Sequence, residues 1–173
     1  MFNALIITGD KVQDHEFIYP YYRLQEAKYK VTVATSNGND INGYYGTRIE
    51  VDVSINDIST KGFDLLILPG GAKAMEYIRQ DRRIIKFIAD FHAQGGVIGS
   101  ICHGAQLLIS AGLVSGKVIS GYYSIKDDIL NSGGKWSYKP VVFDDRIVTS
   151  PHYKYLGPWM KKVLQVTRAV ARS

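Results

Sequence analysis

The sequence predicts an α/β fold in which a mainly parallel β-sheet carries helices on both faces and ends one strand in a nucleophile elbow. Short apolar runs at 2–8, 64–68 and 97–101 are typical of strands buried on both sides of a sheet. Segments whose apolar residues follow a helical period lie between these runs. Because strands that alternate with helices form right-handed crossovers, this order predicts helices on both faces of the sheet.

The remaining elements follow in order along the chain. Asp14 is the predicted N-cap of the first helix, and Pro20 either kinks that helix or delays its start. The stretch 41–55 combines glycines with an alternating apolar pattern, which predicts a hairpin-like excursion at the sheet edge. Further strands are expected at 30–36, at 117–119 and, in two pieces, within 136–150; further helices are expected at 82–94, after the elbow as far as 111–112, at 125–131 and at 155–171.

The elbow contains Cys102, which is the only cysteine of the chain. Small residues, Ser100 and Gly104, stand two places on either side of it, as a tight strand-to-helix turn requires. Because the N–H groups and dipole of the following helix favour thiolate over thiol, Cys102 is predicted to be a reactive nucleophile. The adjacent His103 could hold the thiolate or accept its proton. The alternative is that Cys102 is a small buried hydrophobic residue.

Three loops are predicted to meet at one rim of the sheet, because ligands of parallel sheets bind beyond the carboxyl ends of the strands. These loops are 9–16, the turn 69–71 and the elbow. In the turn, Gly70 and Gly71 let backbone N–H groups approach a substrate oxygen, which is the shape of an oxyanion hole completed by the N–H of His103. An ordinary glycine turn is the alternative interpretation.

Two further side chains are candidates for the same site. Glu16 could hydrogen-bond the cysteine sulfur, or act as an acid or base if burial raised its pKa; a first-turn glutamate favoured by the helix dipole is the alternative. Tyr122 could donate to a substrate carbonyl, although packing is the simpler interpretation. The histidines show no paired ligand spacing, and no phosphate loop or dinucleotide fingerprint follows a strand, so neither a metal nor a cofactor is expected.

The composition is that of an ordinary globular protein with one domain spanning 1–173. Hydrophobic residues make up 46% of the chain, and a single cysteine excludes an internal disulfide framework. The formal charge of +5 is scattered without an aromatic–basic repeat, so no nucleic-acid partner is expected. With no signal peptide and no apolar run approaching about 18 residues, we expect a cytoplasmic protein that does not enter a membrane.

These motifs resemble those of the ThiJ/PfpI family in the DJ-1-like superfamily, and within it the PfpI-like branch of intracellular proteases and deglycases. The resemblance covers about 2–166 and rests on the stretches 14–20, 64–71, 100–104 and 109–112, together with Tyr122 and 126–128. It implies a flavodoxin-like three-layer sandwich related to class I glutamine amidotransferases. It also implies self-association as a homodimer or a higher homo-oligomer.

The resemblance also implies roles for individual residues. Cys102 would be the nucleophile, Glu16 the carboxyl partner of the sulfur, and Gly71 and His103 the donors of the oxyanion N–H groups. In PfpI-like proteins a glutamate from a neighbouring subunit completes a triad with the histidine. Glu76 is the candidate here, one residue further from the glycine turn than is usual.

The resemblance implies a cofactor-free, stress-protective cysteine enzyme that acts on small reactive aldehydes or glycated side chains. The reaction would convert methylglyoxal to lactate in the manner of a glyoxalase, or remove early glyoxal adducts as a deglycase does. An intracellular cysteine peptidase is one alternative, and a redox-sensing or chaperone-like stress protein that uses oxidation of Cys102 is another. An amidotransferase is excluded because His152 is followed by Tyr153 and Lys154 rather than by a His-x-Glu pattern.

Overall fold

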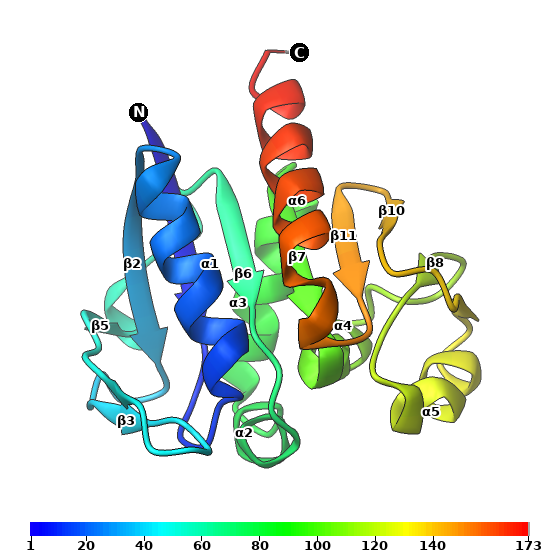
Figure 1. Ribbon diagram of the computed structural model, residues 1–173, viewed down its shortest axis with the longest axis horizontal. Coiled ribbons are helices and arrows are strands. Elements are labelled where there is room, and N and C mark those ends of the chain that lie inside the picture. The colour runs from blue at the N-terminus through cyan, green and yellow to red at the C-terminus, as the bar shows by residue number, and fades with distance from the viewer. Residues whose placement is uncertain (173) are drawn as a thin grey trace.

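The computed structural model describes residues 1–172 and contains a seven-stranded sheet with the strand order β10-β11-β7-β6-β1-β2-β5 (Figure 1). Every pairing is parallel except that of β10 with β11 at one edge. This confirms the α/β prediction. The strands are β1 Phe2–Ile7, β2 Tyr29–Thr35, β5 Val53–Ser54, β6 Leu65–Leu68, β7 Val97–Ile101, β10 Val142–Asp144 and β11 Ile147–Ser150.

Helices cover both faces of the sheet. Figure 1 shows α1 and α6 side by side on the near face, and α3 lies behind the central strands. The helices are α1 Asp14–Glu26, α2 Ala72–Ile78, α3 Arg82–Ala93, α4 Ala105–Ser110, α5 Lys126–Asn131 and α6 Leu156–Val170. None of the described helices is long and apolar enough to cross a lipid bilayer.

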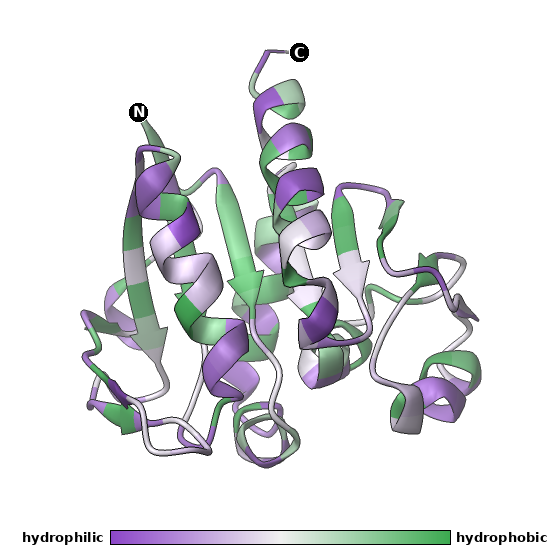
Figure 2. Ribbon diagram, in the orientation of Figure 1, coloured by the Kyte–Doolittle hydropathy of each residue, from purple (hydrophilic) through white to green (hydrophobic). Residues whose placement is uncertain are grey.

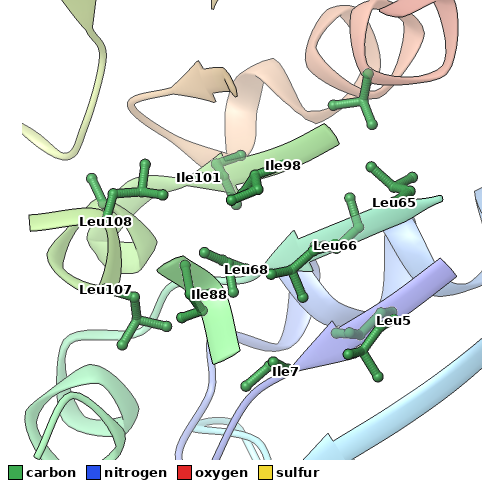
Figure 3. Packing of buried hydrophobic residues seen from close by; sticks show 14 of the residues in the cluster. Leu5, Ile7, Leu65, Leu66, Leu68, Ile88, Ile98, Ile101, Leu107 and Leu108 are labelled. Carbon is green, nitrogen blue, oxygen red and sulfur yellow. The ribbon is translucent and has the colours of Figure 1, made fainter. Parts of the chain in front are cut away.

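The hydrophobic core lies on both sides of β1, β6 and β7. Figure 3 shows leucines and isoleucines of these strands gathered with Ile88 of α3 and with Leu107 and Leu108 of α4. All four residues of β6 are inaccessible to solvent, and Figure 2 shows this strand in apolar colours while α6 alternates between polar and apolar positions. Burial of each such side chain contributes about 1.5–3 kcal/mol to the stability of the folded state. These strands are therefore a stable support for the loops at the carboxyl edge of the sheet.

The start of α1 differs from the prediction in two ways. Gln13 caps the helix, with its side-chain oxygen accepting from the N–H of His15 at 3.1 Å. Asp14 is the first helical residue instead of the cap, and its buried carboxylate accepts the N–H groups of Tyr45 and Thr47 at 2.8 and 3.0 Å. The helix starts at Asp14, so the option of a late start at Pro20 is wrong. The carboxylate of Asp14 binds a loop that is distant in the sequence, and the local sequence pattern around Asp14 cannot predict such a contact.

The excursion between β2 and β6 forms the predicted hairpin at the edge. Strand β3 (Ile41–Asn42) pairs antiparallel with β4 (Arg48–Ile49), and the turn between them is the segment bound by Asp14. The region after the elbow holds a second small sheet, in which β8 (Val118–Ile119) pairs parallel with β9 (Lys135–Trp136) outside the main sheet. Helix α2 was not predicted, because its seven residues are too few to show a period.

Candidate active site

A cleft of about 1180 Å³ opens at the carboxyl ends of the parallel strands. The loop after β1, the turn after β6 and the elbow after β7 all reach it, as the rim argument predicts. Its lining residues are Lys11, Gln13, Glu16, Tyr44, Tyr45, Gly71, Ala72, Lys73, Glu76, Arg79, Gln80, Arg82, Cys102, His103, Gln106, Ser110, Tyr122, His152 and Tyr153. The cleft therefore collects every predicted site residue except Gly70, whose N–H donates to the lining residue Glu16.

The elbow holds Cys102 in a left-handed backbone conformation with a φ of 58°. One 3₁₀ turn, Cys102–Gly104, joins β7 to α4. A Cβ on Gly104 would collide with the carbonyl oxygen of Leu68 and approach the hydroxyl of Ser100 to 2.9 Å. The elbow thus requires small residues two places on either side of the cysteine, because strand and helix backbones meet there.

Glu16 projects from the first turn of α1 into the base of this elbow and is completely buried. Its Oε2 accepts the N–H of Gly70 at 2.6 Å. Burial raises the pKa of Glu16 to about 8, against the smaller opposing effects of that hydrogen bond and of an interaction with the Cys102 side chain. A carboxyl group with such a pKa exchanges protons near neutral pH, which is what an acid/base partner of the thiol requires.

The thiol of Cys102 differs electrostatically from the sequence-based expectation. Burial and the neighbouring charge of Glu16 raise its pKa above the ordinary range, and hydrogen bonds from the N–H groups of His103 and Gly71 only partly oppose this. The expectation that the N–H groups and dipole of the following helix favour thiolate over thiol is therefore wrong, because burial and Glu16 outweigh them. The protons of Cys102 and Glu16 are coupled, because an ionised Glu16 disfavours the thiolate and a protonated Glu16 does not.

His103 also contacts the sulfur of Cys102. Its Nδ1 is 3.3 Å from the Sγ of Cys102, and its Nε2 is 3.4 Å from the hydroxyl of Ser124. Burial lowers the pKa of His103, so the imidazole is neutral at pH 7 and able to accept a proton. The ring stacks on Tyr122 with centroids 4.6 Å apart, while the N–H of Tyr122 donates to the carbonyl of Cys102. Sequence reasoning missed Ser124, which carried no motif of its own.

A family model described as DJ-1/PfpI matches residues 3–166 of this chain. The chain belongs to the DJ-1/PfpI family. Over 164 residues it is 34% identical to the deglycase PfpI of Pyrococcus furiosus, covering 95% of this chain and 98% of that protein. Over 150 residues it is 36% identical to protein/nucleic acid deglycase 2 of Escherichia coli, covering 85% and 86%.

Solved structures agree with this membership. The crystal structure of DJ-1beta from Drosophila melanogaster superimposes with a TM-score of 0.88 at 26% identity, over 99% of this chain and 96% of that chain. The resemblance to this family seen in the sequence is thereby confirmed, and so is the layered α/β fold with a nucleophile elbow.

Glu76, the candidate for a family-type triad, lies on α2 at the edge of the same cleft. Its carboxylate is exposed and pairs with Lys73 of the same helix at 2.8 Å. In the single chain the side-chain partners of His103 are Cys102 and Ser124 rather than Glu76. A role for Glu76 on a neighbouring subunit stays a prediction, as does the expected oligomer.

Gly70 and Gly71 have different surroundings in this DJ-1/PfpI site. The N–H of Gly70 is already bound to Glu16, whereas the N–H of Gly71 is directed at the sulfur of Cys102 together with that of His103. A Cβ on Gly70 would lie 2.9 Å from both the Cβ of Cys102 and the nitrogen of His103, so only glycine fits between them. Gly71 has a φ of 98°, which also favours glycine.

The stretch after β11 supplies an aromatic wall of the cleft with His152 and Tyr153. His152 lies 4.2 Å from the ring of Tyr153 and 6.1 Å from that of Tyr122, measured between centroids, and His15 stacks on Tyr153 at 5.0 Å. Burial and Lys154 lower the pKa of His152. Within residues 1–172, no three histidine, cysteine, aspartate or glutamate side chains gather closely enough to hold a metal ion.

Proposed function

We propose that this protein is a cofactor-independent cysteine enzyme that acts on reactive 2-oxoaldehydes or on their early adducts with thiols and amines. The observation that carries the proposal is the contact between the Cys102 thiol and the buried, high-pKa carboxyl of Glu16 at the base of the cleft. Membership of the DJ-1/PfpI family and the deglycase names of its relatives support the same chemistry.

The first step in this proposal is addition of the thiol to the aldehyde. The Sγ of Cys102 forms a bond to the aldehyde carbon, the carbonyl electron pair moves to oxygen, and the thiol proton passes through Glu16 to that oxygen. The product is a hemithioacetal. In the free site the N–H groups of Gly71 and His103 donate to the sulfur of Cys102. In this proposal they become the donors for the developing oxyanion.

The second step is an internal redox rearrangement. Neutral His103 or the carboxylate of Glu16 removes the proton from the former aldehyde carbon, the electron pair forms a carbon–carbon double bond, and the electron pair of the adjacent ketone moves to its oxygen, which takes a proton to give an enediol. The hydroxyl of the first carbon then loses its proton and becomes a carbonyl, while the second carbon takes a proton, which leaves a thioester with a hydroxyl group beside it. The first carbon is oxidised and the second is reduced by the same two electrons, so no external oxidant is required.

The last step is hydrolysis of the thioester. Water attacks the carbonyl carbon, the carbon–sulfur bond breaks, and the sulfur recovers a proton to regenerate Cys102. The net reaction adds one water to methylglyoxal and yields lactate. An early adduct enters the same sequence once its bond to the thiol or amine breaks and frees the aldehyde carbon.

Turnover of methylglyoxal by matched variants tests this proposal. We expect lactate from the wild type, none from Cys102→Ser, and a loss of about 10²–10⁴-fold in kcat/KM in Glu16→Gln, because the proton partner of the thiol is removed. Glu26→Gln is the control, since Glu26 is exposed on the same helix and its ion pair within residues 1–172 is with Arg23. Full activity in Glu16→Gln would contradict the assigned role of this residue.

The same variants separate the alternatives. A peptidase is favoured by the Cys102–His103 distance of 3.3 Å, and it would cleave casein in a Cys102-dependent manner. A redox sensor requires a thiolate that peroxide can reach, whereas this thiol is 7% exposed and has a raised pKa. Absence of lactate together with rapid peroxide oxidation of Cys102 would replace the enzyme proposal with the sensor.

A further inference from the structure

The cleft beside Cys102 is electropositive. Four cations line it, namely Lys11, Lys73, Arg79 and Arg82. Two acids line it, and of these Glu16 is buried with a raised pKa, while Glu76 is paired with Lys73. A concave surface with an excess of one charge raises the local concentration of ligands of the opposite charge.

Arg79 is the cation that the fold holds in place. It is half-buried at the end of α2, where its Nε and Nη2 both donate to the hydroxyl of Ser110 at 3.1 Å. Within residues 1–172 it makes no ion pair with any carboxylate. A guanidinium has five N–H donors in a planar fork, so the donors not engaged by Ser110 remain for a carboxylate or a phosphate.

The position of Arg79 relative to the nucleophile follows from the elbow helix. Gln106 and Ser110 are four residues apart on α4 and both line the cleft, so they lie along one face of that helix, and Cys102 lines the cleft from the 3₁₀ turn that precedes it. At a rise of about 2 Å per residue in the 3₁₀ turn and about 1.5 Å in the helix, Ser110 lies on the order of 12 Å from Cys102. A group held by Arg79 is therefore separated from the reacting carbon by several bonds, a distance that free methylglyoxal cannot span.

We propose that the preferred substrates carry an anionic group, a carboxylate or a phosphate, and that Arg79 on its Ser110 support is the specificity-determining residue that binds it. The inference rests on the proposed function and deepens it, because it selects adducts of anionic thiols or amines over the free aldehyde and over neutral adducts. Lys11 and Arg82 also line the cleft and make no ion pair within the described residues. Their positive charges add to the electrostatic field that attracts the anion.

A pair of substrates that differ only in charge tests this inference. The hemithioacetals of methylglyoxal with N-acetylcysteine and with N-acetylcysteine amide share every atom near the reacting carbon. We expect kcat/KM to be about tenfold higher for the N-acetylcysteine adduct than for its amide, because only the carboxylate forms a charge-assisted bidentate contact with Arg79. In Arg79→Gln the ratio of the two kcat/KM values should be near one. The control Arg23→Gln alters an arginine on α1 that pairs with Glu26, and it should keep the wild-type ratio. A wild-type ratio of one would overturn the inference.

The source of the anion is distinguished by competition. Stronger inhibition of wild-type turnover by phenyl phosphate than by benzoate, lost in Arg79→Gln, assigns the subsite to phosphate. The reverse order assigns it to carboxylate. Equal and weak inhibition that Arg79→Gln does not change would overturn the subsite.

A second readout needs no turnover and so separates this inference from the proposed function. Maleimidohexanoic acid and its amide alkylate Cys102 by adding the sulfur to one carbon of the maleimide double bond and the proton to the other. We expect the acid to react about tenfold faster than the amide in the wild type, and equally fast in Arg79→Gln. If neither hemithioacetal is turned over but this preference persists, the anion subsite stands and the proposed function fails. If the wild type shows no preference, the subsite fails.

Discussion

Glu16 and Gly70 are joined by a hydrogen bond of 2.6 Å that links the first helix to the turn after β6. This bond engages the N–H of Gly70 and leaves those of Gly71 and His103 to contact the sulfur of Cys102. It also holds the buried carboxyl group of Glu16 in place. The other oxygen of that group, Oε1, has no nitrogen or oxygen partner among the described residues. The pair therefore determines both which donors face the substrate and how the thiol exchanges its proton.

The raised pKa of Glu16 makes stability depend on pH. Its pKa rises from an ordinary 4.5 to about 8 on folding, so the folded state binds this proton more tightly than the unfolded state does. The contribution to the free energy of unfolding is complete below about pH 4.5 and is lost as pH rises through about 8, on the order of 4–5 kcal/mol. Glu16→Gln should flatten this decline, as urea titrations at several pH values would measure.

The matched control for this prediction is Glu26→Gln, at an exposed position on the same helix. It should leave the decline between about pH 4.5 and about pH 8 as in the wild type. Identical slopes for Glu16→Gln and the wild type would mean that another group, and not Glu16, holds the proton.

Ser124 is expected to orient the imidazole of His103. Removing its hydroxyl in Ser124→Ala frees Nε2 of the ring, so we expect a fall of about 5–10-fold in kcat and a shift of the acid limb of its pH profile, which reports protonation of the base His103. Steady-state kinetics from acid to alkaline pH would measure both. Ser115→Ala, at an exposed position away from the cleft, serves as the control. An unchanged profile in Ser124→Ala would remove Ser124 from the site.

The elbow should not tolerate a methyl group at Gly104. In Gly104→Ala the new Cβ meets the carbonyl oxygen of Leu68, which is backbone within the central sheet and cannot move aside. We expect a loss of about 1–3 kcal/mol in the free energy of unfolding, measured by denaturant titration, and loss of activity. Gly157→Ala provides the contrast, because its Cβ meets only the hydroxyl of Tyr19 at 4.0 Å. That variant should match the wild type or exceed its stability.

The left-handed conformation of Cys102 implies stored backbone strain. With a φ of 58°, Cys102→Gly should be more stable than Cys102→Ala by about 1 kcal/mol, although both lack the sulfur. Thermal or denaturant unfolding of the two variants would measure the difference. Ala105→Gly tests the opposite case, since Ala105 has a φ of −60° and glycine there should destabilise the protein. A more stable Cys102→Ala would show that the elbow is unstrained.

The sequence by itself determined the elements and the place of the site. Buried parallel strands show as short apolar runs, and an elbow needs small residues at set distances from its nucleophile, so both leave local patterns. The rim prediction followed from topology, and the structure brings Glu16, Gly71, Cys102, His103 and Glu76 to one cleft. The short helix α2 escaped prediction because its seven residues show no period. The strand expected at 117–119 is present as β8, but its pairing with β9 outside the main sheet was not predicted.

Only the tertiary structure decided the electrostatics and the partners of each group. The hydrogen bond from Gly70 to Glu16 joins residues 54 positions apart, and that from Tyr45 to Asp14 joins residues 31 apart. The elbow pattern favoured a thiolate, yet burial and Glu16 raise the pKa of Cys102, because desolvation depends on everything packed around the sulfur. Motifs place a nucleophile in a chain, whereas its proton affinity is a property of the whole packed environment.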